Sequence, residues 1–454
     1  MSKIIVNKIG GGILVDKYIP LIPLRIQAQI KNGYTPILVV SAFPGITDDI
    51  LFFAKQIKEN QKINESIYIK SILSKHTKII DSFIIDTKIK NQTLNQLDEL
   101  FLKFEKDIKL FIDNKKNTDK SPIYEDALVA YGERFAATII AKFLENKDMV
   151  TKRVLAEDIP IITDDNFKDA NIIKDISTKN HNSYFIKKIK NNSNSVLIIP
   201  GFTGKTKAGA TTTLGRGGTD TAACFIGSAL KVKKIILWKN VGGVMSCDPR
   251  LVTNVKKIST ISYDQAIEAG KIIHEKAIDY VKNSKTPIEI TSIENPKHST
   301  TIKDIRTKES GAKIISLKRN AQLFLINDET LGISELISFT GNVFSKYKTE
   351  IVLISNTRYG LQVVAYDEND SMESIKREIS NKVQKVEKTV CDMIFMVGQF
   401  NPNDVSDFNN LLIKQGVDLN ISAFYYQNCT RIEAVIKTKN IEKVVNAVHG
   451  KFIK

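Results

Sequence analysis

Residues Thr211–Thr221, T-T-T-L-G-R-G-G-T-D-T, form the stretch that says most about the fold of this chain. The stretch follows an apolar, strand-like run and leads into an apolar helical pattern. Its glycines allow positive φ angles and a close approach of the backbone to a ligand. We expect Thr219 or Asp220 to cap the helix, whose first N–H groups would then face an anion. Arg216 could bind a carboxylate or phosphate through two hydrogen bonds, and the alternative is a capped loop with a surface arginine.

A second glycine-rich junction lies near the N-terminus, where Lys8-Ile9-Gly10-Gly11-Gly12 follows a strand-like run and precedes a helical pattern. This order brings a lysine and free backbone N–H groups together, as phosphoryl transfer requires. The motif alone is weak evidence, but it predicts a phosphate-binding turn.

A third junction comprises Val39–Ala42 and the following Gly45–Asp48. It again leads from a strand pattern through a loop into a helix. The hydroxyl groups of Ser41 and Thr47 are suited to hydrogen-bonding a small polar ligand. Ordinary N-capping of the helix by Thr47 is the alternative.

Glu133 and Arg134 lie inside a strongly helical run, Tyr124–Asn146, among apolar neighbours. A Glu-Arg pair on a helix is usually surface charge. The apolar surroundings favour a partly buried helix instead, and a buried carboxylate needs a partner. The ammonium group of a substrate could be that partner.

Trp238 ends a further strand pattern, and Asp248-Pro249-Arg250 follows two glycines downstream of it. Arg250 could contact the phosphates of a nucleotide. The alternative is a β-turn in which Pro249 fixes φ.

The first 290 residues alternate short β-branched runs with longer helical patterns, which predicts a parallel or mixed sheet covered by helices. Beyond the polar stretch 294–310, shorter strands alternate with shorter helices, which suggests two small α/β regulatory modules. We place a catalytic domain at 1–306 and a regulatory region at 307–454, with modules at about 318–388 and 389–454.

Composition excludes several classes of protein. At 454 residues and 42% apolar content, two or three folded units are expected. No apolar run approaches the roughly 18 to 20 residues of a membrane-spanning helix, and no signal-like segment is evident, so we expect a cytoplasmic protein without membrane partners. The net charge of +16 comes from scattered lysines, which argues against nucleic-acid binding. Four separated cysteines disfavour a zinc site or disulfide framework.

In this order, the motifs resemble those of the aspartate kinases in the amino acid kinase superfamily. The matching segments are Lys8–Ile13, Val39–Asp48, Gly132–Arg134, Gly201–Asp220, Trp238–Arg250 and Gly270–Glu275. The resemblance implies an αβα sandwich with a mostly parallel central sheet, followed by two ferredoxin-like ACT modules. It also implies ATP-dependent phosphorylation of the L-aspartate side chain, with Mg²⁺ held mainly by the ATP phosphates, and a homodimer formed through the ACT-like modules.

The resemblance also implies roles for individual residues. Lys8 and Asp220 would be catalytic, with Lys8 stabilising the transferred phosphoryl group. Arg216 would bind the α-carboxylate of aspartate, and Glu133, helped by Asp220, its ammonium group. The other residues expected in the aspartate pocket are Ser41, Thr47, Phe202 and Thr219. Those expected to bind ATP are Lys8, Gly10, Gly11, Trp238, Lys239, Arg250 and Lys271.

This chain departs from the family pattern at several positions. Gly12-Ile13 replaces a Thr-Ser pair, and Lys239-Asn240 replaces a segment with acidic residues. The first ACT-like module lacks an evident inhibitor-binding pattern, so feedback inhibition is not expected. A catalytically degenerate amino-acid sensor and a related kinase acting on glutamate or acetylglutamate are the alternatives.

Overall fold

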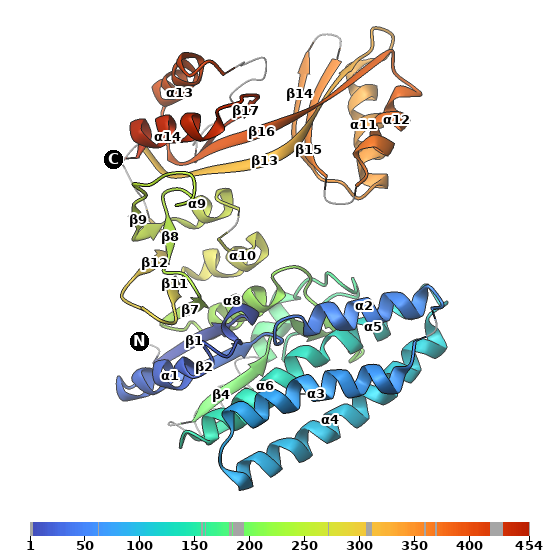
Figure 1. The fold of residues 1–454 in the computed structure, drawn as a ribbon, viewed down its shortest axis with the longest axis vertical. Coiled ribbons are helices and arrows are strands. Elements are labelled where there is room, and N and C mark those ends of the chain that lie inside the picture. The colour runs from blue at the N-terminus through green and yellow to red at the C-terminus, as the bar shows by residue number, and fades with distance from the viewer. Residues whose placement is uncertain are drawn as a thin grey trace. The chain divides into compact units, whose positions relative to one another are not determined.

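The computed structural model describes residues 3–61, 63–155, 158, 160–180, 184, 195–270, 272–305, 311–357, 360–367, 370–417 and 430–453. The chain forms two compact units, and Figure 1 labels their helices and strands. Unit 1 comprises Met1–Val244 and Lys257–Ile305, and unit 2 comprises Met245–Lys256 and Arg306–Lys454.

Eight of the described strands of unit 1 form one sheet in the order β10-β12-β11-β7-β1-β2-β4-β3. Every neighbouring pair is parallel except β11 and β12. The strands are β1 (Ile4–Ile9), β2 (Thr35–Val40), β3 (Thr151–Arg153), β4 (Val196–Pro200), β7 (Lys234–Lys239), β10 (Thr260–Ile261), β11 (Ile288–Ser292) and β12 (Ser299–Ile302).

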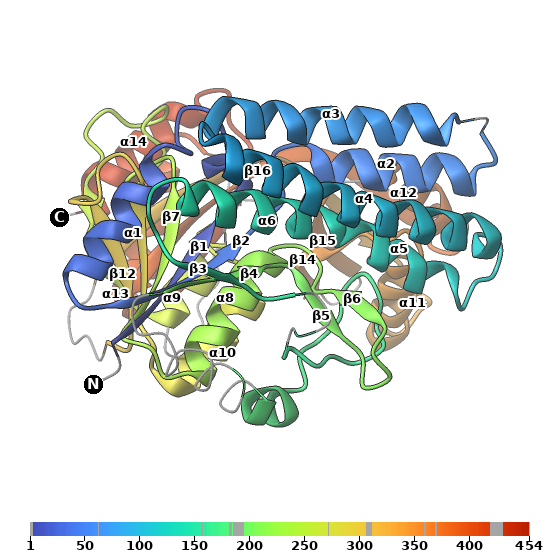
Figure 2. The same cartoon turned by 90° about the horizontal axis from the view of Figure 1, so that it is seen from below.

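Helices cover both faces of this sheet, as Figure 2 shows. One face packs against α1 (Leu21–Lys31), α2 (Ile46–Lys58), α3 (Glu65–Phe83), α4 (Thr87–Asn114), α5 (Ser121–Val129) and α6 (Tyr131–Glu145). The other packs against α8 (Gly218–Ala229), α9 (Tyr263–Glu268) and α10 (Glu275–Ser284). Because successive side chains of a strand point to opposite faces, a sheet covered twice needs strands that are apolar at almost every position. The expected αβα sandwich with a mostly parallel sheet is confirmed.

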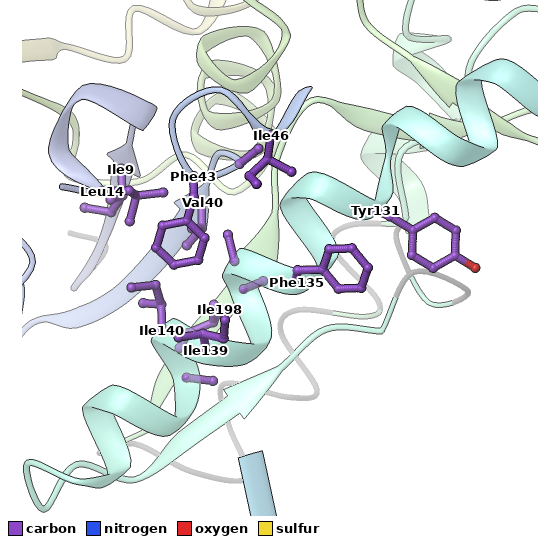
Figure 3. Close-up of a cluster of buried hydrophobic side chains, with 14 of the residues drawn as sticks. Ile9, Leu14, Val40, Phe43, Ile46, Tyr131, Phe135, Ile139, Ile140 and Ile198 are labelled. Carbon is purple, nitrogen blue, oxygen red and sulfur yellow. The ribbon is translucent and has the colours of Figure 1, made fainter. Parts of the chain in front are cut away.

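Helix α6 is fixed to the sheet by a buried apolar contact. Figure 3 shows Ile139 and Ile140 of α6 pointing toward Val40 of β2 and Ile198 of β4. These side chains are 0 to 1% exposed. Phe135, one turn earlier, stacks on Phe101 of α4 with ring centroids 4.4 Å apart. The first turn of α6 is therefore held firmly beside the end of β2.

Three helical segments differ from the sequence prediction. The run expected as one helix over 125–146 is divided at Ala130 into α5 and α6. The sequence also predicts one helix over 262–283, but the structure divides this run into α9 and α10, and Gly270 between them adopts a φ of 67°. Helix α3 was not predicted. Within the described ranges, no helix combines the length and apolar character needed to span a bilayer.

Unit 2 contains a five-stranded sheet in the order β14-β15-β13-β16-β17. Its strands are β13 (Gly311–Asn327), β14 (Ile351–Thr357), β15 (Gly360–Tyr366), β16 (Lys385–Gln399) and β17 (Arg431–Ile436). Its helices are α11 (Ile333–Lys346), α12 (Met372–Ser380), α13 (Pro402–Lys414) and α14 (Ile441–Phe452). The long strands β13 and β16 contribute to two apolar clusters, one with α11 and α12 and one with α13 and α14. The expected modules, about 318–388 and 389–454, each use consecutive residues, whereas here β13 serves both clusters.

The segment 245–256 belongs to unit 2, although we expected it in the catalytic domain. Cys247 and Val252 are buried in the cluster that contains α13 and α14. Ser246 Oγ lies 2.9 Å from Nε2 of His449, and the carbonyl of Leu251 accepts a hydrogen bond from Asn446. Apolar burial and these bonds explain why the segment packs with unit 2.

Candidate active site

A cavity of about 640 Å³ in unit 1 lies at the C-terminal ends of β1, β2 and β4 and at the start of α8. In parallel α/β sheets, this edge is the usual place for ligand binding. The cavity is lined by Lys8, Ser41, Thr47, Asp48, Leu51, Glu125, Asp126, Val129, Glu133, Lys168, Phe202, Thr213, Gly215, Arg216, Gly217, Gly218, Thr219 and Asp220. It thus brings together all eight residues that were predicted to be catalytic or to bind aspartate.

Lys8 and Asp220 form an ion pair, with Nζ 2.7 Å from Oδ1. Their side chains are only 12% and 10% exposed, so water screens the pair weakly. A Cβ on Gly10 would lie 2.8 Å from Lys8 Nζ, which means that the lysine occupies the space a larger residue would need. The structure therefore provides one oriented, partly buried cation at the end of β1.

Arg216 lies between Gly215 and Gly217, whose φ angles are 70° and 73°. Helix α8 begins at Gly218 with Gly217 as its N-cap and no side-chain cap, so the expectation that Thr219 or Asp220 caps this helix was wrong. The left-handed glycine turns the chain into the helix without a capping side chain. Arg216 is exposed, and no carboxylate in the described part of the chain pairs with it.

Glu133 lies in the first turn of α6 and is 2% exposed. Its Oε1 accepts a hydrogen bond of 3.1 Å from the backbone N–H of Ala42. Its Oε2 is buried, and no described residue donates a hydrogen bond to it. Desolvation raises the pKa of this carboxyl to about 8. A Cβ on Gly132 would lie 2.8 Å from Cβ of Ala42, so glycine at 132 allows the helix to approach this loop.

Ser41, Thr47 and Phe202 complete the wall of the cavity. Thr47 is not the N-cap of α2, because the helix begins at Ile46 after Gly45, whose φ is 79°. The N-capping alternative for Thr47 is therefore wrong, and its side chain lines the cavity instead. Phe202 has a left-handed φ of 65°, and its ring occupies the space that a Cβ on residue 218 would need.

Most residues predicted to bind ATP do not line this cavity. Gly10 follows β1, and Gly11 begins a short 3₁₀ turn, Gly11–Ile13. Trp238 is 4% exposed, and its indole N–H donates to Oδ1 of Asn7, 3.0 Å away. Its ring belongs to the apolar core on the α6 side of the sheet.

Lys239 follows Trp238 at the end of β7, beside β1. Burial lowers the pKa of its ammonium group and the positive charge of Lys8 adds to this, whereas the carboxylate of Asp220 acts in the opposite direction. Lys239 thus contributes a second cation near the Lys8–Asp220 pair.

Arg250 belongs to unit 2, where its guanidinium group pairs with Asp248 at 2.6 Å. Its backbone N–H donates to the same carboxylate, which forms a local turn and matches the turn alternative. Lys271 lies outside the described residues.

Several cavity residues were not predicted, and Asp126 is the most buried of their charged side chains at 2% exposed. Its neighbour Glu125 pairs with Lys58 and with Nζ of Lys168, the latter at 2.9 Å. Desolvation raises the pKa of Asp126 to about 6. Two adjacent acidic residues in an apolar helical run were a signal in the sequence, because charged groups inside a protein need partners.

Comparisons with known proteins are consistent with the fold and the residues of the cavity. The profile of the amino acid kinase family matches residues 3–292. Aspartokinase 1 of Arabidopsis thaliana, a chloroplastic protein, is 25% identical over 373 residues, which cover 78% of this chain and 62% of that protein. The aspartokinase of Rickettsia felis is 32% identical over 216 residues, or 46% of this chain and 52% of that protein. The chain therefore spans less than two thirds of either relative.

One solved structure shares the whole fold. E. coli aspartokinase III, in complex with lysine and aspartate in its T-state, matches with a TM-score of 0.81. The sequences are 19% identical, and the match covers 100% of both chains.

Proposed function

Because this chain belongs to the amino acid kinase family, we propose that it is an aspartate kinase. It transfers the γ-phosphoryl group of ATP to the side-chain carboxylate of L-aspartate and forms 4-phospho-L-aspartate, the first step toward lysine, threonine and methionine. The Arabidopsis and Rickettsia relatives, both aspartokinases, support this choice of substrate. So does the E. coli structure, which holds aspartate in the same fold.

The buried oxygen of Glu133 is the observation that carries the proposal. Oε2 of Glu133 is buried without a hydrogen-bond partner among the described residues, so the ionised carboxylate can pair with a cation bound in the cavity. Arg216, which has no acidic partner among the described residues, offers the complementary charge. An α-amino acid has one ammonium and one α-carboxylate, so Glu133 and Arg216 can hold it by its backbone groups. The side chain of the amino acid is then free to face Lys8.

The chemistry asks little of the protein beyond positioning and charge neutralisation. A carboxylate with a reference pKa of about 3.9 is ionised at neutral pH, so no general base is needed. Negative charge accumulates on the phosphoryl group during transfer, and Lys8 is placed to neutralise it. Asp220, 2.7 Å from Lys8 Nζ, holds that ammonium group in place.

We propose that ATP binds at the ends of β1 and β7, next to Gly10, Gly11 and Lys239. Mg²⁺ bound with ATP would supply charge neutralisation for the phosphates. Asp220, an acidic side chain beside Lys8 and Lys239, would help to hold it, which fits a metal carried mainly by the nucleotide. Trp238, Arg250 and Lys271 stay predictions for the nucleotide site.

We also propose that unit 2 mediates a homodimer. Strand β14 is an edge of the five-stranded sheet, and Ile354 on it is 41% exposed. An unpaired edge strand is a natural place for a second copy to pair. Light scattering on the purified protein should give twice the chain mass.

Hydroxylamine trapping tests the catalytic proposal. Purified protein with ATP, Mg²⁺ and L-aspartate should produce aspartyl hydroxamate, and the Lys8→Ala variant provides the blank. Glutamate and acetylglutamate in place of aspartate should give none. Aspartate binding without any hydroxamate would reject the kinase and favour an amino-acid sensor.

A further inference from the structure

Asp126 joins two chain segments beside the Arg216 loop. Its Oδ2 accepts hydrogen bonds from the backbone N–H groups of Lys168, at 2.9 Å, and of Thr213, at 2.7 Å. Its Oδ1 accepts a hydrogen bond from the hydroxyl of Thr213 at 3.0 Å. Asp126 itself lies on α5, which packs against β6.

Thr213 is the last residue of β6 (Thr211–Thr213) and precedes Arg216 by three residues. Its carbonyl also accepts a hydrogen bond from the N–H of Ala170, at 2.9 Å. Strand β6, which leads into the Arg216 loop, is therefore held by hydrogen bonds to both Asp126 and Ala170. A shift of β6 would move the guanidinium group directly, because only Leu214 and Gly215 separate them.

The second segment, around Lys168, packs against the same loop. Lys168 has a φ of 75°, an uncommon left-handed conformation for a residue with a side chain. Its hydrogen bond to Asp126 helps to retain that conformation. A Cβ on Gly215 would lie 2.1 Å from Oδ1 of the adjacent Asp169, so this segment forms a wall for the Arg216 loop.

We propose that Asp126 is a positioning residue for aspartate binding, which sets the Arg216 loop by holding Thr213 and Lys168. The inference rests on the proposed function and adds a residue that acts through Arg216 and not on the substrate. What the role requires is an acceptor for the two N–H groups and a partner for the Thr213 hydroxyl. A negative charge is not required, since an amide can make all three bonds.

The test compares Asp126→Asn with Asp126→Ala. Asparagine can accept both N–H bonds with its carbonyl oxygen and donate its amide N–H to the Thr213 hydroxyl, so its KM for aspartate should stay within about threefold of the parent. Alanine removes all three bonds, so its KM for aspartate should rise roughly tenfold or more. The KM for ATP should change less than about threefold in both variants.

Asp328→Ala is the matched control. Asp328 is also buried at 3% exposed and accepts several backbone hydrogen bonds, from Thr330, Leu331 and Gln384, but it lies in unit 2. This variant should leave the KM for aspartate unchanged. If the KM for aspartate rose as much in Asp126→Asn as in Asp126→Ala, the positioning role would be overturned, and the negative charge itself would be what aspartate binding needs. Equal increases in KM for aspartate and ATP would reduce Asp126 to a purely structural residue.

Hydrogen exchange separates this inference from the proposed function. Amide exchange at residues 214–217 should be faster in Asp126→Ala than in the parent and unchanged in Asp126→Asn. This readout needs no substrate, so it holds even if the parent protein does not bind aspartate. Unchanged exchange in the alanine variant would refute the inference while leaving the aspartate kinase proposal intact.

Discussion

Aspartate binding should weaken as the pH falls from 8 to 6, because the carboxyl group of Glu133 must be ionised to pair with an ammonium group. Burial raises the pKa of this carboxyl in the free protein to about 8. Below that value, each bound aspartate must displace a proton from Glu133. One pKa unit corresponds to about 1.36 kcal/mol, so the Kd should rise about fifty-fold between pH 8 and pH 6.

Isothermal titration calorimetry measures both the affinity for aspartate and the number of protons released on binding. Titrations at pH 7 in two buffers with different ionisation enthalpies should show release of almost one proton per aspartate bound. Glu133→Gln is the matched variant, because glutamine keeps the acceptor for the N–H of Ala42 but cannot ionise. It should bind aspartate about 10- to 150-fold more weakly at pH 8, the range for a lost charge-assisted hydrogen bond, and with a Kd that does not vary with pH.

The free energy of unfolding shows whether Glu133→Gln loses aspartate affinity simply because it is misfolded. The pKa of Glu133 is higher in the folded chain than the ordinary value of 4.5, so between about 4.5 and 8 the native state holds a proton that the unfolded state lacks. This group therefore lowers the free energy of unfolding as the pH rises through that window. Glu133→Gln should gain stability relative to the parent from pH 5 to pH 8 while losing aspartate affinity. A Kd of the parent that is flat from pH 6 to pH 8, without proton release, would refute the reasoning.

Three further substitutions test other parts of the site. Arg216→Ala should weaken aspartate binding by roughly tenfold or more and ATP binding much less, since its proposed partner is the α-carboxylate; equal losses in two calorimetric titrations would contradict this role. Lys8→Ala should lower kcat in the hydroxamate assay by about 10² to 10³, the usual effect of removing one group that stabilises a transition state, and a loss below tenfold would count against it. Gly132→Val should lower the free energy of unfolding in urea by about 1–3 kcal/mol, because its Cβ would overlap Ala42, and an unchanged midpoint would show that the loop yields.

Much of the fold could be predicted from the sequence because local pattern and burial coincide in unit 1. Strands such as Lys234–Lys239 and Val196–Pro200 carry buried apolar residues that face both sides of the sheet. In the flanking segments, apolar residues recur every three or four positions, as in a helix. Part of the cavity lining was also predictable, because Arg216 lies in a glycine-rich turn and Lys8 lies in the strand that precedes another. Glycines at such positions mark where the backbone must turn or approach a ligand.

What could not be predicted depends on contacts between distant segments. Asp126 contacts Thr213, 87 residues away, and no local pattern indicates that pairing. The N-cap of α8 was expected at Thr219 or Asp220 because such residues often cap helices, yet Gly217 turns the chain without a side chain. The assignment of Cys247 to unit 2 depends on apolar partners more than 60 residues further along the chain. In each case the tertiary contact outweighs the local preference.

The packing of segment 245–256 into unit 2 has a consequence for synthesis and for gene construction. During translation this segment leaves the ribosome long before its partners on α14, such as Asn446 and His449, have been made. Its contacts with α14 can form only after α14 has been made, whereas the hydrogen bond from the N–H of Ile315 to the carbonyl of Ser246 can form earlier. For the same reason, a gene fragment that starts at residue 306 encodes a regulatory unit without Cys247 and Val252 in its core. A self-sufficient fragment needs residues 245–256 joined to its N-terminus through a linker that replaces 257–305.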